Sequence, residues 1–287
     1  MKKIFELSLA ALLLVANHGD ASAAQDGNKE TMMESVRHLN DFQTIELRRY
    51  VTKDGERTRF AQYFETWFPE AFEQLGAMVF GQFLDRDHPT HFSWLRGFKD
   101  INARPIVSSA FYYGPLWKEH RGKLNAALDD SDNVMLLRPL RPESGIPVLP
   151  AVDPVTDKKG AQGIVVIQIF AIRKGSENAF AEQAVAAFAR YRMAAVHQAG
   201  VLVSLDVPNN FPQLPIRTDG PWLVWIGVIE DKQALDVRFE PIAKTVAQSL
   251  VATGLLREAP ELLVLDPTPR SRLRWLPDAT DVAISPR

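Results

Sequence analysis

Two similar stretches decide the fold of this chain: HFSWLRGFKD at residues 91–100 and WLVWIGVIED at residues 222–231. Each is a strand-like apolar run that ends at an acidic residue where a helix can begin. The second stretch starts 131 residues after the first. A sequence that contains nearly the same strand and strand end twice is expected to hold an internal repeat.

The repeat extends to both sides of these two strands. The matching pairs are IELRRYVTKDG (45–55) with VVIQIFAIRKG (165–175), Phe60 with Phe180, Trp94 with Trp225, and MLLRPL (135–140) with ELLVLDP (261–267). Their order and approximate spacing agree in both halves, and the extra residues of the second half lie mainly in 207–219. The sequence therefore predicts two copies of one unit, each about as long as an ordinary domain.

Each copy is predicted to have the element order β-α-β-β-α-β. Apolar residues at three- and four-residue steps from Phe60 to Leu75 indicate a helix after the first strand. The other expected elements are strands at 77–84, 91–98 and 133–140 with a helical region at 100–128, then strands at 163–172, 200–206, 221–229 and 261–266 with helices at 175–198 and 231–253. This order is that of a ferredoxin-like split βαβ unit.

One such unit leaves a sheet face uncovered, which gives a physical reason for the second copy. Both helices lie on one face of a four-stranded sheet, so another sheet can cover the opposite face. We therefore predict an α+β fold of two tandem ferredoxin-like repeats. Their antiparallel sheets would pair face to face as a pseudo-dimer of the dimeric α/β barrel type. The sequence leaves open whether the repeats pair within one chain or between two, and leaves the oligomeric state open.

Alternation along the first strand places three polar residues on one face. Glu46, Arg48 and Tyr50 alternate with the apolar Ile45 and Leu47. We expect the apolar side chains to face the helices and the polar trio to face a cavity between the sheets. The matching residues of the second copy are mostly apolar, so the expected cavity has one polar and one apolar wall. Such a cavity is a candidate ligand site.

The ends and the middle of the chain have different compositions. Two lysines, ten apolar residues and an Ala21-Ser22-Ala23 site indicate a signal peptide cleaved near Ala23/Ala24. Ten apolar residues are too few to span a bilayer, so we expect export to a bacterial periplasm or medium and no membrane span afterwards. The predicted segments are a signal peptide (1–23), a flexible leader (24–41), a first domain (42–140), a proline-rich linker (141–162), a second domain (163–275) and an irregular tail (276–287).

Composition and charge limit the class of protein. The chain is 46% hydrophobic and 24% charged, which is typical of a packed domain. Its 33 basic and 35 acidic residues give a formal net charge of −2, so no overall field attracts nucleic acid. The absence of cysteine excludes disulfides, thiolate metal sites and cysteine nucleophiles.

Three stretches resemble the NIPSNAP family. ELRRY (46–50) is similar to the opening of NIPSNAP domains, FKDINAR (98–104) to their strand-to-helix signature, and residues 110–140 to the C-terminal half of bacterial members. The resemblance covers about 42–140, and the second repeat looks like a diverged copy. It implies a dimeric α+β barrel, a fold shared with small cofactor-free monooxygenases, and it brings no general catalytic chemistry.

The ligand-binding candidates lie on the first copy: Glu46, Arg48, Tyr50, Trp94, Arg96, Tyr113, Trp117 and His120. Trp117 and His120 are one helical turn apart, so they offer an aromatic surface and an imidazole that can move a proton. The alternative that we favour is that Trp117 packs on the sheet while His120 caps a surface contact. Glu46 and Arg48 either bind a ligand or form a structural ion pair. No residue is assigned a catalytic role.

Neither a metal nor a cofactor is predicted. The loop that contains Asp85, Asp87, His88 and His91 offers oxygen and nitrogen ligands. Pro89 between the histidines leaves their geometry undefined, so a solvated loop is the favoured interpretation. His197 invites comparison with haem-binding barrels, but the apolar stripe of its predicted helix places it towards the flank, and a lone imidazole is weak support for haem.

Three hypotheses of function follow. The first is an exported NIPSNAP-type protein that binds a small hydrophobic or aromatic ligand, or a protein partner. The second is a cofactor-free monooxygenase or isomerase for a small aromatic or polyketide-like substrate, which needs His120 or Glu46 to face a closed pocket. The third is a structural assembly module, which would have a filled barrel and an exposed apolar patch, with a homodimer as one form.

Overall fold

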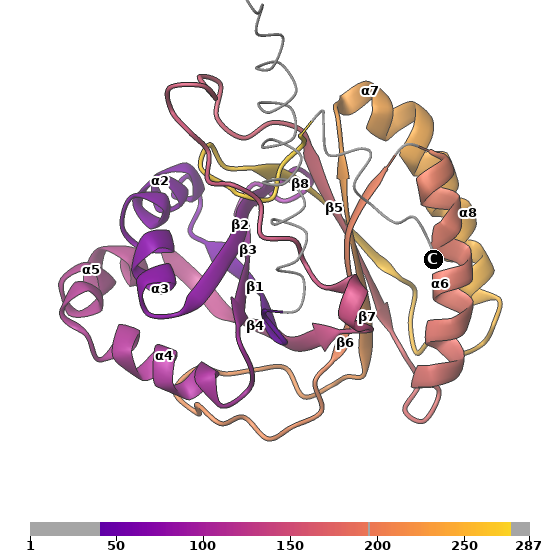
Figure 1. Cartoon of the computed structure of the whole chain (residues 1–287), viewed down its shortest axis with the longest axis horizontal. Helices are drawn as coiled ribbons and strands as arrows, with labels where there is room; N and C mark the ends of the chain where they lie inside the picture. The colour runs from indigo at the N-terminus through magenta and orange to yellow at the C-terminus, as the bar shows by residue number, and fades with distance from the viewer. Residues whose placement is uncertain (1–40, 195, 277–287) are drawn as a thin grey trace, which may run out of the picture.

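A computed structural model of the chain describes residues 41–194 and 196–276 (Figure 1). The predicted signal peptide, leader and tail lie outside these residues, except for residues 41 and 276. The elements of the first half are β1 (Thr44–Thr52), α2 (Arg57–Trp67), α3 (Pro69–Gln74), β2 (Ala77–Asp85), β3 (His91–Phe98), α4 (Ala103–Tyr112), α5 (Pro115–Ala126) and β4 (Leu128–Pro139). The remaining elements are η2 (Pro142–Ser144), β5 (Ile164–Ala171), α6 (Glu177–Met193), β6 (His197–Ser204), β7 (Trp222–Ile229), α7 (Lys232–Ala234), η3 (Leu235–Phe239), α8 (Glu240–Val251) and β8 (Glu261–Pro267).

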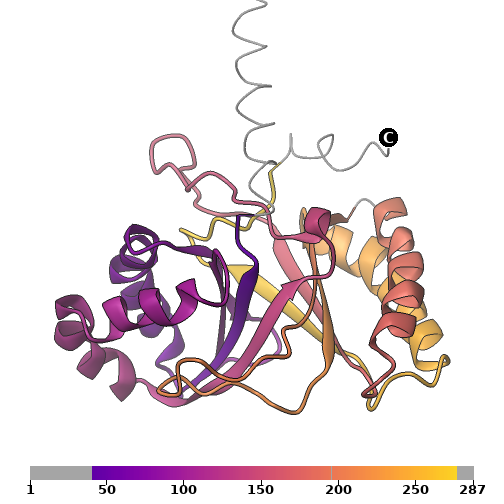
Figure 2. The ribbon, with the colours of Figure 1, turned by 60° about the horizontal axis from the view of Figure 1, so that its bottom comes forward.

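Eight strands close one antiparallel barrel within the chain, which confirms the predicted fold class. Their order around the barrel is β1-β3-β2-β8-β5-β7-β6-β4. Each half contributes four neighbouring strands, and the halves join where β2 pairs with β8 and β4 pairs with β6. The two copies therefore pair within one chain. Figure 2 shows their helices on opposite outer sides of the barrel.

The acidic residues that end the two similar strands do begin helical segments. The Asp100 carboxylate accepts hydrogen bonds from the backbone N–H groups of Asn102 and Ala103, each 2.9 Å long. The Asp231 carboxylate accepts one of 2.8 Å from the N–H of Ala234. These bonds satisfy N–H groups that the first turn of a helix leaves without partners. The expectation drawn from the two strands is therefore confirmed at both of them.

Two predicted helices differ from the structure. The helix expected from Phe60 to Leu75 is divided into α2 and α3, because Pro69 has no N–H and takes the first position of a new helix. The helix expected at 175–198 ends at Met193, and His197 opens β6 opposite Val228. The placement of His197 on a helix flank was therefore wrong.

The barrel interior is filled with apolar side chains from both halves. Leu47 and Leu95 of the first half pack in one core with Ile167 and Val224 of the second, and all four side chains are fully buried. The segment predicted as a linker, 141–162, lies against this core through the buried Ile146. Within the described residues, no helix has the length and apolar character that crossing a membrane requires.

Candidate ligand-binding site

The polar trio of β1 faces the helices of the first half and not the barrel interior. Tyr50 packs in the same core as Phe60 of α2, with 6.2 Å between ring centres, while Ile45 and Leu47 lie in the barrel core. The predicted directions of the two faces were therefore wrong. Alternation shows which residues share a face of a strand, but it does not show which layer covers that face.

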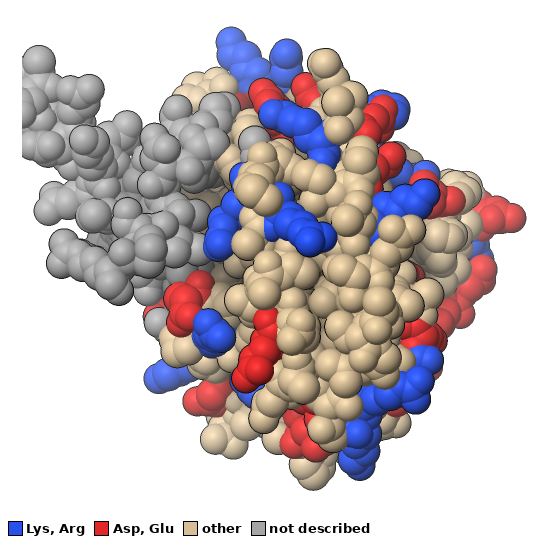
Figure 3. All heavy atoms as spheres, turned by 90° about the vertical axis from the view of Figure 1, so that its right-hand side faces the viewer, with Lys and Arg blue, Asp and Glu red and all other residues tan. Residues whose placement is uncertain are grey.

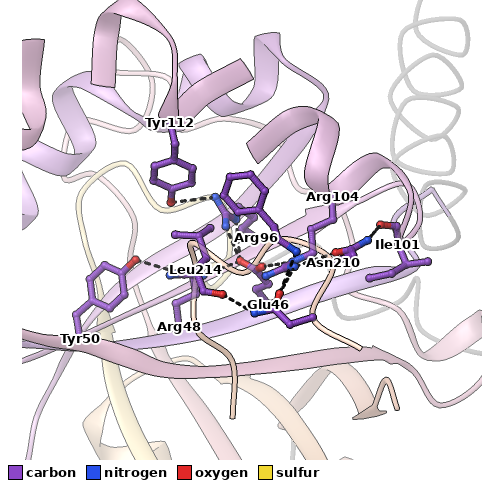
Figure 4. Close-up of polar contacts among 11 residues, drawn as sticks. Glu46, Arg48, Tyr50, Arg96, Ile101, Arg104, Tyr112, Asn210 and Leu214 are labelled. Carbon is purple, nitrogen blue, oxygen red and sulfur yellow. Dashed lines mark hydrogen bonds and ion pairs between the residues drawn. The ribbon is translucent and has the colours of Figure 1, made fainter. Parts of the chain in front are cut away.

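Glu46 lies at the centre of a buried cluster of charged groups (Figure 4). Its Oε2 accepts hydrogen bonds from Arg96 (Nε, 3.0 Å; Nη2, 2.6 Å) and from Arg48 (Nη1, 2.9 Å). Its Oε1 accepts one from Arg104 Nε at 2.6 Å. Glu46 and Arg96 are directly opposite each other on β1 and β3. None of the four side chains is more than 2% exposed.

The cluster keeps Glu46 ionised. Burial by itself raises the pKa of this carboxyl, but the charges of Arg96, Arg48 and Arg104 outweigh burial and hold the pKa well below its usual range. Burial also raises the pKa of the Tyr50 hydroxyl. Tyr50 is therefore a neutral phenol at physiological pH, and its oxygen accepts a hydrogen bond of 2.9 Å from Arg48 Nε.

A cavity of about 170 Å³ lies beside this cluster, between the sheet and α2–α5. Most of its wall is aromatic, and Arg48 lines it. The lining residues are Arg48, Tyr50, Phe64, Phe68, Phe72, Trp94, Phe111, Tyr112, Trp117, Leu124, Asn125, Leu128, Ser131 and Leu214. An apolar pocket with one charged group is the usual form of a small-molecule site.

A long segment of the second half, 205–221, reaches this site. Figures 1 and 2 both show it running below α4. The side-chain oxygens of Asn209 and Asn210 each accept a bond of 2.9 Å from Arg104 Nη1, and Leu214 lines the cavity. The buried Phe211 lies 6.2 Å from Tyr112, ring centre to ring centre. The extra residues noted at 207–219 are thus the cover of the first-half site.

Of the predicted ligand-binding residues on the helices, Trp117 lines the cavity and Tyr113 does not. Trp117 lines the cavity, where its ring lies 5.0 Å from that of Tyr112. Tyr113 is 55% exposed and does not line the cavity; its neighbour Tyr112 does, because the two side chains leave the end of α4 in different directions. The Tyr112 hydroxyl also accepts a bond of 3.5 Å from Arg96.

His120 is buried away from the cavity. Its Nδ1 is 2.6 Å from the Tyr63 hydroxyl, and its ring stacks on Trp67 with 4.2 Å between centres. These contacts join α5 to α2, so they account for the burial of the imidazole without a ligand. His120 is therefore not positioned to act on a molecule in this cavity.

Sequence reasoning missed several residues of the site. Arg104 is fully buried and is the third arginine on Glu46, and it is the last residue of the stretch FKDINAR (98–104). The stretch 98–104 had been noted for its resemblance to a family signature, but its spacing from β1 in the sequence does not show that Arg104 contacts Glu46. The aromatic residues of α2 and α3 were expected only as core, since lining a cavity and filling a core need the same side chains.

The second half has no matching charged cluster among its described residues. Val166 and Phe170 occupy the positions of Glu46 and Tyr50 and pack in an apolar core against α6 and α8. Gln168, in the position of Arg48, accepts a hydrogen bond of 2.5 Å from the Tyr191 hydroxyl. The candidate site therefore belongs to the first half alone.

Two further histidine groups lie outside the site. Side-chain ligand atoms of Asp85, His88 and His91 lie within 4.8 Å of one another in the β2–β3 hairpin. The Asp85 carboxylate already accepts backbone bonds from Asp87 (2.9 Å) and His88 (3.0 Å), which fits a structured loop. His197 stacks on Trp275 at 4.2 Å between ring centres. The prediction of no metal and no cofactor stays a prediction.

Solved structures share the fold of this chain. An anthrone oxidase-like protein matches with a TM-score of 0.52 and 11% identity over 80% of this chain and 93% of its own. A protein from Fusobacterium nucleatum, named as a proposed monooxygenase, matches with a TM-score of 0.51 and 12% identity over 82% and 96%. At such identities the likeness shows the fold alone, here that of dimeric α+β barrel proteins.

A NIPSNAP domain protein from Burkholderia xenovorans also matches, with 16% identity over 33% of this chain and 93% of its own, but its TM-score of 0.31 is too low to argue from. No protein-family model matches the chain, and no curated protein matches it.

Charge on the outer face beside α6 and α8 is mixed in sign. Figure 3 shows basic and acidic side chains interspersed around its rim, with few charged groups in its middle. A nucleic-acid interface would carry a stripe of one sign. This face therefore offers no such stripe. The exposed apolar side chains on described helical segments include Ile106 on α4, Met193 on α6 and Val237 on η3.

Proposed function

We propose that this chain is an exported α+β barrel protein of the NIPSNAP type that binds a small aromatic ligand between the first-half sheet and α2–α5. The observation that carries the proposal is the aromatic cavity of about 170 Å³ with Arg48 in its wall. An apolar cavity of about 150 Å³ can hold one benzene molecule. The cavity thus suits a ligand with a single ring.

The residues behind the NIPSNAP resemblance support the same site. Glu46, Arg48 and Tyr50 of the stretch ELRRY (46–50) are three of its buried polar groups, and Arg104 of FKDINAR is a fourth. Both stretches thus meet at one cluster beside the cavity. A motif whose residues assemble around a pocket fits a binding role better than a purely structural one.

Native mass spectrometry of the mature protein from its own cells tests the proposal. A small molecule released on denaturation, and identified as aromatic, is the expected result. The mass of the mature chain reports signal cleavage near Ala23, and the complex reports monomer or homodimer. In a matched variant, Leu124→Trp fills the cavity and should remove the ligand, since Leu124 is a buried residue of its wall. A ligand that Leu124→Trp retains at full occupancy refutes the location.

A cofactor-free monooxygenase or isomerase is the alternative function. The fold it shares with the anthrone oxidase-like protein favours it, but fold is analogy only. Proton abstraction in the cavity needs a base, while Glu46 is held by three arginines and His120 lies outside the lining. A ligand recovered from the protein with an added oxygen atom would favour this alternative over binding.

A further inference from the structure

The charged cluster beside the cavity has an excess of positive charge. Three guanidinium groups, of Arg48, Arg96 and Arg104, surround the single carboxylate of Glu46, so two positive charges are in excess. The ion pairs of all three guanidinium groups are with this one carboxylate. Their other partners are neutral amides and phenols, such as Asn209 and the Tyr50 hydroxyl. Buried charge without a counter-charge is costly, so an anion beside these arginines would be stabilised.

Two N–H donors at the cavity wall lack a protein partner. Arg48 donates from Nε to Tyr50 and from Nη1 to Glu46, and its Nη2 donates to no described residue. Trp94 Nε1 is buried without a partner, and Trp94 also lines the cavity. The Arg48 guanidinium carbon lies 5.6 Å from the Trp94 ring centre. Buried donors are normally bonded, so the indole N–H of Trp94 beside Arg48 indicates an acceptor that enters the cavity.

The wall of the cavity restricts what that acceptor is attached to. Phe72, Phe111 and Trp117 line the cavity together with Arg48. A strongly hydrated inorganic anion would lose water there without replacement hydrogen bonds. A flat aromatic body gains contact with the same rings. Arg48 Nη2 and Trp94 Nε1 suit the two oxygens of a carboxylate, and the guanidinium charge makes the bond from Arg48 a charge-assisted one.

We infer that the ligand of this cavity is a small aromatic carboxylate, with its ring among the aromatic side chains and its carboxylate on Arg48. The inference rests on the proposed function and names the chemical class of its ligand. The neutral Tyr50 hydroxyl, which accepts from Arg48, lies in the same wall and has its own proton to donate. Arg96 and Arg104 share Glu46 with Arg48, so one carboxylate offsets three guanidinium charges.

The experiment compares benzoate with benzamide, which has nearly the same shape and no charge. Calorimetric titration of the full chain should give a dissociation constant for benzoate about tenfold to a hundredfold lower, since a hydrogen bond to a charged group contributes about 1.5–3 kcal/mol. Arg48→Gln should remove this preference, so that benzoate and benzamide then bind with similar dissociation constants. Arg49→Gln is the matched control, because Arg49 pairs with Glu261 outside the cavity.

The outcomes distinguish the carboxylate inference from the proposed function, which is binding of an aromatic ligand. Equal binding of benzoate and benzamide to the unaltered chain overturns the carboxylate inference and leaves the proposed function standing. Failure of both to bind at millimolar concentration overturns both. Loss of the benzoate preference in Arg49→Gln also overturns the assignment to Arg48. If Arg48→Gln does not fold, Trp94→Phe keeps an aromatic ring, removes the Nε1 donor and should reduce the benzoate preference.

Discussion

Replacement of Glu46 by glutamine should destabilise the protein more than any other single loss of charge described above. Glu46 is fully buried and accepts four hydrogen bonds, from Arg48, Arg96 and Arg104. Glutamine keeps the size of the side chain but leaves three buried guanidinium groups without a counter-charge. Removing one partner of a buried ion pair costs about 3–5 kcal/mol. Whole domains are stable by about 5–15 kcal/mol, so the loss is a large share.

Urea unfolding of Glu46→Gln and of a matched control measures this cost. Glu261→Gln removes a carboxylate that receives two bonds from Arg49, at 2.6 and 2.8 Å, but its side chain is 44% exposed. An exposed ion pair contributes about 0–1 kcal/mol. We expect a lower midpoint with an unchanged slope for Glu46→Gln and little change for the control. If Glu46→Gln lowers the free energy of unfolding by less than about 1 kcal/mol, the view that Glu46 alone offsets the charge of the three arginines is refuted.

Three further predictions concern acid, the imidazole and the cover. The folded pKa of Glu46 lies below its ordinary value of 4.5, so the ionised carboxylate stabilises the fold above pH 4.5, and this stabilisation is lost as the pH falls towards the folded pKa. Urea unfolding midpoints of the unaltered chain should therefore decline as the pH is lowered from 4.5, and those of Glu46→Gln should decline less. His120→Gln should lower the melting temperature through its lost Tyr63 contact and leave benzamide affinity unchanged, whereas a weakened affinity places the imidazole in the site. Phe211→Ala should lower the free energy of unfolding by at most about 3–5 kcal/mol and should weaken benzamide binding. Unchanged benzamide binding would contradict the covering role of residues 205–221.

The repeat made most of the fold predictable from the sequence. The two similar stretches that end at Asp100 and Asp231 aligned the two halves of the sequence, and the sheet order follows from the ferredoxin-like unit. The helix ends were harder, because Pro69 divides one helix and the segment after Met193 turns into β6. Local pattern predicts that an element exists better than it predicts where the element stops.

The candidate site was predictable in its residues but not in its position. Glu46, Arg48, Tyr50 and Trp94 were all named from the sequence, and all belong to the site. Their face was assigned to the wrong layer, because both layers beside β1 are buried and alternation cannot distinguish them. The contacts of Asn209 with Arg104 join residues 105 positions apart, and only the folded chain shows such a pair.

The difference between the two halves explains how one chain can keep a buried charged site. In the second half, Val166 and Phe170 fill the helix-side layer with apolar contacts, which stabilise the fold without any need for a ligand. The barrel connects this core to the first half through the β2–β8 and β4–β6 pairs. The backbone N–H of Arg217 bonds to Val134 O at 2.8 Å, so the cover is also attached to β4. One half of the barrel can thus carry excess positive charge, because the other half supplies both a stable core and the segment that closes the site.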